Sequence, residues 1–250
     1  MPAHTIKAFD EDIERLRALI SQMGGLAEHA IGEAMRCLVE RDTDGAEKIV
    51  DNDKKLDALE IETERRAVQL IALRAPMAGD LRDTVAALKI SGVVERIGDY
   101  AKNIARRVTK LDRGTNIEPL SLLPEMARIA TSMVHDVLDA FVERDADAAV
   151  RVCQRDQAVD DFYDSIFRTL LTHMMENPQN IGQAAHLLFV AKNLERVGDH
   201  ATNIAEMVYY AATGKHMTDK TTPSQPVEEM PRPKPKAAKP AAKAGRKAKK

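Results

Sequence analysis

The chain has 250 residues, of which 4% are aromatic and none is Trp. It is rich in Ala, Leu, Glu, Arg and Lys, a composition that favours helices over sheets. It has no run of 18 apolar residues, which argues against a transmembrane helix, and its N-terminal residues lack the apolar core of a signal peptide, so we expect a cytoplasmic protein. The formal net charge is −2, but residues 231–250 carry nine Lys and Arg and no acid, which leaves −11 for residues 1–230 and favours cations over nucleic acid as ligands of the folded part.

Hydrophobic periodicity predicts an all-α chain of six helices in two sets of three. The expected helices are 5–41, 45–74, 77–112, 117–144, 147–176 and 179–213. Asp-rich breaks with related sequences occur at 41–46 and 144–148, and Pro76 and Pro178 mark the later turn in each set. The longest break, residues 111–119, separates the two sets.

These breaks predict three segments along the chain. Residues 1–113 form the first three-helix repeat, and residues 114–216 form the second. Residues 217–250 are dominated by Pro, Ala and Lys toward their end and cannot bury enough apolar surface to fold, so we expect a disordered basic tail. Such a tail serves either solubility or electrostatic contact with anionic lipid or nucleic acid.

One eleven-residue phrase occurs twice in the chain, 100 residues apart. Residues 95–105 read ERIGDYAKNIA and residues 195–205 read ERVGDHATNIA, with eight positions identical. Each copy spaces a Glu, an Asp and an Asn four residues apart, which places the three side chains on one face of a helix. These residues are Glu95, Asp99 and Asn103 in the first copy and Glu195, Asp199 and Asn203 in the second. The duplication indicates two equivalent sites.

The turn at Pro76 brings further acids to the first site. Asp57 precedes this proline by the same distance in sequence as Glu95 follows it, and the same equality holds for Asp53 and Asp99. In an antiparallel helix pair with equal rise per residue, each of these pairs sits at one height. We therefore expect four carboxylates together.

The second turn gives nearly the same register. Asp160 and Glu195 lie at almost equal distances in sequence before and after Pro178, and so do Asp156 and Asp199. The match holds to about one residue along the helix. A second cluster of four carboxylates is therefore expected.

Four uncompensated carboxylates at a helix contact repel one another. Raised pKa values, basic partners or metal ions would relieve the repulsion. Arg96 and Arg196 adjoin the two Glu residues but point about 100° away on a helix, which makes them poor partners. Carboxylate and amide oxygens are hard ligands that suit magnesium, manganese or iron. Gly98 and Gly198 lie between the acids and allow a neighbouring helix to approach closely.

The two ER[IV]GD[YH]AxNIA phrases, together with PMAGDLR at residues 76–82, resemble the PhoU family of regulators of bacterial phosphate uptake. The resemblance covers about residues 5–213. It implies two three-helix bundles related by pseudo-twofold symmetry, commonly in a homodimer. By position, Glu95, Asp99, Glu195 and Asp199 would carry its multinuclear metal sites, with iron favoured and magnesium, manganese and zinc as other candidates.

The resemblance also implies partners and a role. Family members restrain a membrane sensor histidine kinase and modulate the phosphate transporter, contacting its ATPase subunit, so contact with the membrane would be peripheral and through these partners. The chain departs from internal symmetry at Asp80, Arg82 and Asp83, which have no counterparts in the second half. Any role of these three residues therefore belongs to the first half.

These observations lead to the hypothesis of a non-enzymatic, metal-binding negative regulator of phosphate signalling. One alternative is an enzyme with a carboxylate-bridged metal centre, which the absence of a Glu-x-x-His pattern and of an identifiable nucleophile disfavours. Another is a structural scaffold whose acids are solvated or paired with Lys and Arg. Cys37 and Cys153 are isolated and are expected to be packing residues in a reducing compartment.

Overall fold

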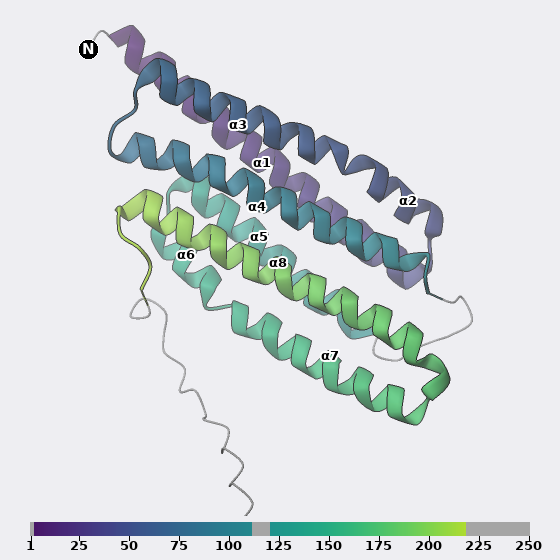
Figure 1. Ribbon diagram of the computed structural model, residues 1–250. Coiled ribbons are helices and arrows are strands. Elements are labelled where there is room, and N and C mark those ends of the chain that lie inside the picture. Colours follow the sequence, from purple (N-terminus) through teal and green to yellow (C-terminus); the bar gives the residue numbers. More distant parts are fainter. Residues whose placement is uncertain (1–2, 112–120, 219–250) are drawn as a thin grey trace, which may run out of the picture.

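The computed structural model describes residues 3–111 and 121–218, and these are almost entirely helical (Figure 1). In chain order the helices are α1 (Ala3–Glu40), α2 (Thr43–Asn52), α3 (Lys54–Arg74), α4 (Gly79–Val108), α5 (Leu123–Glu143), α6 (Ala146–Cys153), α7 (Asp156–Glu176), the 3₁₀ helix η2 (Pro178–Asn180) and α8 (Ile181–Thr213). In this part of the chain, no helix is long and apolar enough to cross a membrane. The predicted boundary at 113/114 and residues 219–250 of the predicted tail lie outside the described residues.

The all-α fold with two sets of three helices is confirmed, but the second helix of each set is interrupted. The helix predicted at 45–74 is divided into α2 and α3, and the helix predicted at 147–176 is divided into α6 and α7. The interruptions fall at equivalent places: Asp53 is the residue before α3, and Asp156 is the first residue of α7. Inside a helix, an Asp side chain competes with the backbone hydrogen bonds. Asp is therefore more favourable at a helix end than in the interior. The first predicted acid of each cluster therefore lies at a kink.

The turns that precede α2 and α6 also repeat one design. Arg41 and Arg144 adopt left-handed backbone conformations with φ of 59° and 57°. The following Asp caps the next helix: Asp42 accepts from the backbone N–H of Gly45 at 2.8 Å, and Asp145 accepts from two backbone N–H groups at 2.9 Å. Such caps satisfy donors that the first helical turn leaves free. The sequence similarity of the two breaks therefore encodes one turn used twice.

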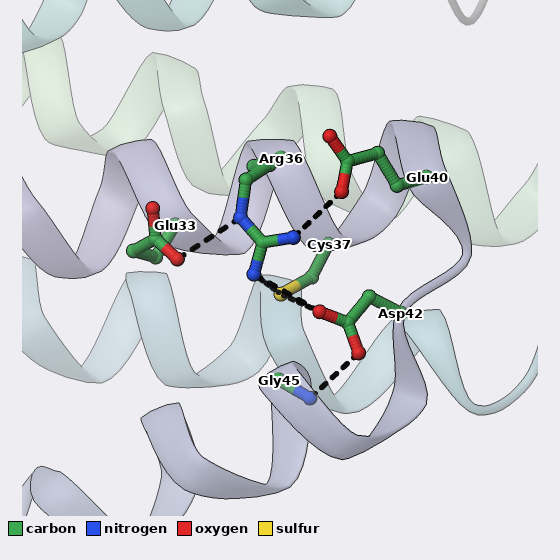
Figure 2. A network of polar contacts seen from close by, with 6 residues as sticks. All are labelled: Glu33, Arg36, Cys37, Glu40, Asp42 and Gly45. Atoms are coloured by element: carbon green, nitrogen blue, oxygen red, sulfur yellow. Dashed lines mark hydrogen bonds and ion pairs between the residues drawn. The ribbon is translucent and has the colours of Figure 1, made fainter.

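Arg36 fixes the first of these turns (Figure 2). Its guanidinium donates to Glu33 at 3.0 Å, to Glu40 at 2.6 Å and to Asp42 at 3.0 Å. Gly45 is required here, because a Cβ at this position would lie 2.7 Å from the sulfur of Cys37. Cys37 itself is buried, as expected of a packing residue.

The helices form two bundles that share a long interface. α1, α3 and α4 pack together, as do α5, α7 and α8, and the bundles meet where α4 lies along α8 and α1 lies along α5 (Figure 1). Apolar residues at helical spacing on the third helix of each set are buried in this core. They comprise Ile90, Val94, Ile97, Ala101, Ile104 and Val108 on α4 and Leu187, Val190, Leu194, Val197, Ala201, Ile204 and Val208 on α8. Burial of these stripes fixes which faces of α4 and α8 remain for polar residues.

The contact between Tyr100 and His200 marks the pseudo-twofold relation of the halves. The two residues occupy the same position in the repeated phrase, and their rings meet edge to face with centroids 5.2 Å apart. The tyrosine hydroxyl lies 3.4 Å from His200 Nε2. Equivalent residues on antiparallel helices meet only where a twofold axis passes between them, so the axis runs through this pair.

Asp83, one of the residues without a counterpart in the second half, ties the bundles together. Its carboxylate accepts from Arg17 of α1 at 3.2 Å and pairs with Arg144, at the end of α5, at 3.3 Å. Burial raises the pKa of Asp83, while Arg144 and Arg17 act in the opposite direction. Arg82 extends the same connection by donating to the backbone carbonyl of Ala211 near the end of α8 at 3.4 Å.

Candidate metal centres

The structure brings the four predicted acids of the first half into one neighbourhood between α3 and α4. Burial raises the pKa of Glu95, and the negative charges of Asp99, Asp57 and Asp53 raise it further. A Cβ built on Gly98 would lie 3.8 Å from Asp53 Oδ1, which places this aspartate directly against α4. The register predicted from Pro76 is therefore correct.

Lys102 supplies a positive charge to this first cluster. Its ammonium group donates to Asp99 at 2.6 Å and also to Asp53, whose side chain is 9% exposed. Burial acts to lower the pKa of Lys102, but these two bonds outweigh it and raise the value. Two of the four carboxylates thus share one positive charge from the chain itself, while Glu95 and Asp57 form no ion pair among the described residues.

The second half brings its four predicted acids together between α7 and α8. Burial raises the pKa of Asp156 to about 6, and Asp160, Asp199 and Glu195 add to the shift in that order. The pKa of Asp160 is also raised, first by burial and then by Glu195 and Asp199. This mutual repulsion identifies a carboxylate cluster that lacks sufficient positive charge.

Lys192 is the basic partner in the second cluster, but it reaches only one of the acids. Its ammonium group donates to Glu195 Oε1 at 2.5 Å. The other oxygen of this carboxylate, Oε2, is buried without a hydrogen-bond partner in the described structure. A buried carboxylate oxygen without a donor is costly, and a cation would relieve that cost.

The two motif glycines let the helices approach closely at both clusters. A Cβ on Gly98 would lie 2.2 Å from a methyl carbon of Leu56. A Cβ on Gly198 would lie 3.1 Å from Asp156 Oδ1 and 3.3 Å from Val159. The close approach expected from the sequence is confirmed, and it brings Asp53 and Asp156 against the helices that carry the other acids of their clusters.

Asn103 and Asn203 lie one turn beyond Asp99 and Asp199. Asn103 is partly buried and Asn203 is exposed. Within the described residues, neither amide side chain forms a hydrogen bond, and so neither is joined to the carboxylates. Their role as ligands stays a prediction.

The donor sets of the two clusters differ in how well they suit a metal ion. Within the described ranges, the side chains as placed form no group of three or more His, Cys, Asp or Glu residues that could hold a metal ion. In the second half, the donor chemistry fits: hard carboxylates, raised pKa values and the unpartnered Glu195 Oε2 all favour a cation. In the first half, Lys102 already occupies the position of a cation between Asp53 and Asp99.

Sequence reasoning missed the side chains that make the clusters unequal. Lys102 is replaced by Thr202 in the second repeat, and Lys192 by Gly92 in the first. Glu60 was missed as well, although it lies as far before Pro76 in the sequence as Gly92 lies after it. A Cβ on Gly92 would lie 3.2 Å from Glu60 Oε1, so counting from the proline would have found this fifth acid.

The family model described as the PhoU domain matches the chain twice, over residues 20–108 and 123–208. The chain belongs to the PhoU family. Both matched segments contain one copy of the repeated phrase, so the acid clusters lie within the shared domain. Residues 219–250 lie beyond both segments.

Several relatives and solved structures support this assignment. The "Phosphate-specific transport system accessory protein PhoU homolog" of Zymomonas mobilis is 54% identical over 218 residues, covering 87% of this chain and 92% of the relative. The homolog of the same description in Caulobacter vibrioides is 46% identical, covering 87% of this chain and 95% of the relative. The crystal structure of PhoU from Pseudomonas aeruginosa is 35% identical, with a TM-score of 0.79 over 83% of this chain and all of that one.

Proposed function

We propose that this chain is a metal-binding regulator of phosphate uptake that acts without catalysis, as an accessory protein of a phosphate transport system. The observation that carries the proposal is the carboxylate cluster of the second half, in which Lys192 pairs with Glu195 and leaves the buried Glu195 Oε2 without a partner among the described residues, placed on the duplicated motif of a PhoU-family fold. The names of the relatives supply the connection with phosphate transport.

The metal proposed for the second cluster is iron, in a multinuclear site, with magnesium, manganese and zinc as alternatives. Glu195, Asp199, Asp156 and Asp160 would hold it after their carboxylates turn toward a common point, and Asn203 would complete the set. A bound cation would add positive charge beside carboxylates whose pKa values are raised by burial and by one another. The site would then join α7 to α8 and stiffen the face that partners meet.

The first cluster is proposed as the weaker metal site. Glu95, Asp99, Asp53, Asp57 and Asn103 are its candidate ligands. A metal there would have to displace Lys102 from two carboxylates, which costs two charge-assisted hydrogen bonds. Lys102 therefore favours the structural alternative for this half, in which acids are solvated or paired with Lys and Arg of the chain itself.

The proposed partners are a sensor histidine kinase and the ATPase subunit of a phosphate transporter, both of which the chain would restrain. The chain would act as a homodimer in the cytoplasm and meet the membrane only through these partners.

Metal analysis of the purified full chain tests the central part of this proposal. The wild type is expected to carry bound metal, and the paired change Glu195→Ala and Asp199→Ala is expected to remove most of it. Glu64→Ala with Asp161→Ala is the matched control, because both acids are exposed and lie outside the two clusters. Equal metal content in all three proteins would contradict the proposal.

A pull-down from phosphate-replete cells tests the regulatory part separately. Recovery of a histidine kinase or of a transporter ATPase with the wild-type chain would support it. Recovery of neither, from cells that contain both, would contradict it even if the metal analysis succeeds.

A further inference from the structure

A basic and aromatic surface lies along the contact of α4 with α8, between the two acid clusters. We call it the α4–α8 arginine surface. It consists of Arg96, Tyr100 and Arg107 of α4 and His186, Phe189, Arg196 and His200 of α8. The two helices lie side by side across the middle of the molecule, with α3 and α7 on the outer sides (Figure 1).

The centre of this surface holds two exposed arginines at equivalent positions of the repeat. The guanidinium carbon of Arg196 lies 6.0 Å from the ring centroid of Tyr100. By the pseudo-twofold relation, Arg96 lies near His200, and its charge helps to lower the pKa of that residue, after burial as the larger cause. In the described ranges neither arginine forms an ion pair, although acids precede both of them in the sequence.

One end of the surface combines a cation with an exposed apolar ring. The guanidinium carbon of Arg107 lies 4.6 Å from the ring centroid of Phe189, and one of its nitrogens lies 3.4 Å from His186 Nδ1. Phe189 is 53% exposed, which is unusual for so large an apolar side chain. Arg and aromatic residues are the types that contribute most to protein interfaces.

The spacing of the arginines decides which kind of ligand fits. Arg96 and Arg107 are about three helical turns apart on one helix, which corresponds to about 16 Å. A single small anion cannot reach both, whereas a helix or extended segment lying along α4 and α8 can. Phe189 requires an apolar counterpart, which a phosphate chain lacks.

The carboxylates on either side argue against nucleic acid. The first cluster borders the surface on the α3 side and the second on the α7 side, and a polyphosphate backbone would be repelled by both. A narrow peptide segment can follow the arginines between them. We propose that the α4–α8 arginine surface binds an acidic, partly apolar segment of a protein partner, whose carboxylates pair with Arg96, Arg196 and Arg107 and whose apolar residues cover Phe189.

The proposal extends the regulator described above by giving it a partner surface, and it has a separate test. The probe is a fluorescein-labelled helical peptide of alternating Glu-rich and Leu-rich turns, and its binding to the full chain is followed by fluorescence anisotropy. Arg96→Glu with Arg196→Glu is expected to weaken binding at least tenfold. Phe189→Ser is expected to weaken it several-fold without any change in charge.

Lys54→Glu with Lys55→Glu is the matched control, because it makes the same change in charge on exposed lysines of α3. Full binding by this control together with loss in the arginine variant supports the proposal. Equal binding by the arginine variant and the wild type would overturn it. Equal weakening by both double variants would also overturn it, because it would indicate non-specific attraction of the acidic peptide to positive charge or binding at the basic C-terminal residues.

Two further measurements keep these outcomes decisive. Circular dichroism and thermal unfolding show whether each variant keeps the helical fold. Arg196→Lys retains the positive charge and should keep most of the wild-type binding, in contrast to the charge-reversed variant, if the fold is unchanged. A single-stranded DNA oligonucleotide is measured in parallel. Loss of DNA binding in the arginine variant without loss of peptide binding would overturn the proposal in favour of a nucleic-acid surface. Metal content should be unchanged throughout, so this result is independent of the metal analysis.

Discussion

Lys102 donates to Asp99 at 2.6 Å, at a position where the second repeat has Thr202. Thr202 instead donates to the backbone carbonyl of Asp199 and leaves the carboxylates of its cluster without that charge. One substitution within a repeated phrase thus gives the first cluster a lysine that bridges two of its carboxylates, whereas the described lysine contact of the second cluster reaches Glu195 alone.

Exchanging these two residues should exchange the properties of the clusters. Lys102→Thr is expected to lower the free energy of unfolding in chelator by about 1 kcal/mol, because Asp53 and Asp99 lose a partly buried partner. It should also raise the metal content of the first half. Denaturant unfolding with chelator and metal analysis without it measure both effects.

Lys54→Thr is the control for this exchange, since Lys54 is exposed and forms no ion pair among the described residues. The reciprocal change, Thr202→Lys, should reduce metal binding at the second cluster. If Thr202→Lys left metal binding unaltered, Lys102 would not be the cause of the difference between the halves.

The pKa of Asp156, raised to about 6, predicts a specific dependence of stability on pH. Because the folded state holds this proton more tightly than the unfolded state, stability falls as the pH rises from about 4 to 6 and then levels off. Asp156→Asn removes this loss. In chelator it should stabilise the protein by about 1 kcal/mol at pH 7, after allowance for solvent screening, and have little effect near pH 4.

Unfolding of the two proteins at several pH values from 4 to 7.5 measures the difference. Asp161→Asn is the control, because Asp161 is exposed on the same helix. A stability difference for Asp156→Asn that does not change with pH would show that Asp156 titrates as an ordinary carboxyl.

A methyl group at Gly98 should disturb the first cluster. Gly98→Ala gains helix propensity of about 1 kcal/mol but drives its new Cβ into the buried side chain of Leu56, so a net loss of about 1 kcal/mol is expected. Gly25→Ala, where no atom lies within 4 Å of the new Cβ, should instead stabilise the protein. Thermal unfolding measures the stability of both variants. A gain in stability for both would mean that the Leu56 side chain moves aside freely.

The ion pairs of Asp83 should contribute to the joining of the two bundles. Asp83→Asn leaves Arg17 and Arg144 without their shared carboxylate, and a loss of about 1–2 kcal/mol is expected. Asp80→Asn, one turn earlier on α4, should have a smaller effect. Denaturant unfolding measures both, and equal effects would indicate that the loss of negative charge alone matters.

Much of the fold could be predicted from local patterns. The stripes of α4 and α8 repeat every three to four residues, and burial follows from that spacing. The interruption at Asp53 was not predicted, because helical periodicity continues across it and the kink depends on how α2 and α3 each fit against α1 and α4. Counting from Pro76 placed Asp57 in one cluster with Glu95, because an antiparallel turn converts sequence distance into height.

The sequence by itself determined the duplicated bundle, the positions of the eight acids and their pairing across each hairpin, because helical rise and turn position are local properties of the chain. Only the tertiary structure decided that Lys102 bridges Asp53 and Asp99, that Glu195 keeps a buried oxygen without a partner among the described residues, and that Tyr100 meets His200. These features depend on side chains from different helices or from different halves of the chain. Their distances depend on how two packed surfaces fit, which no local pattern of residues specifies.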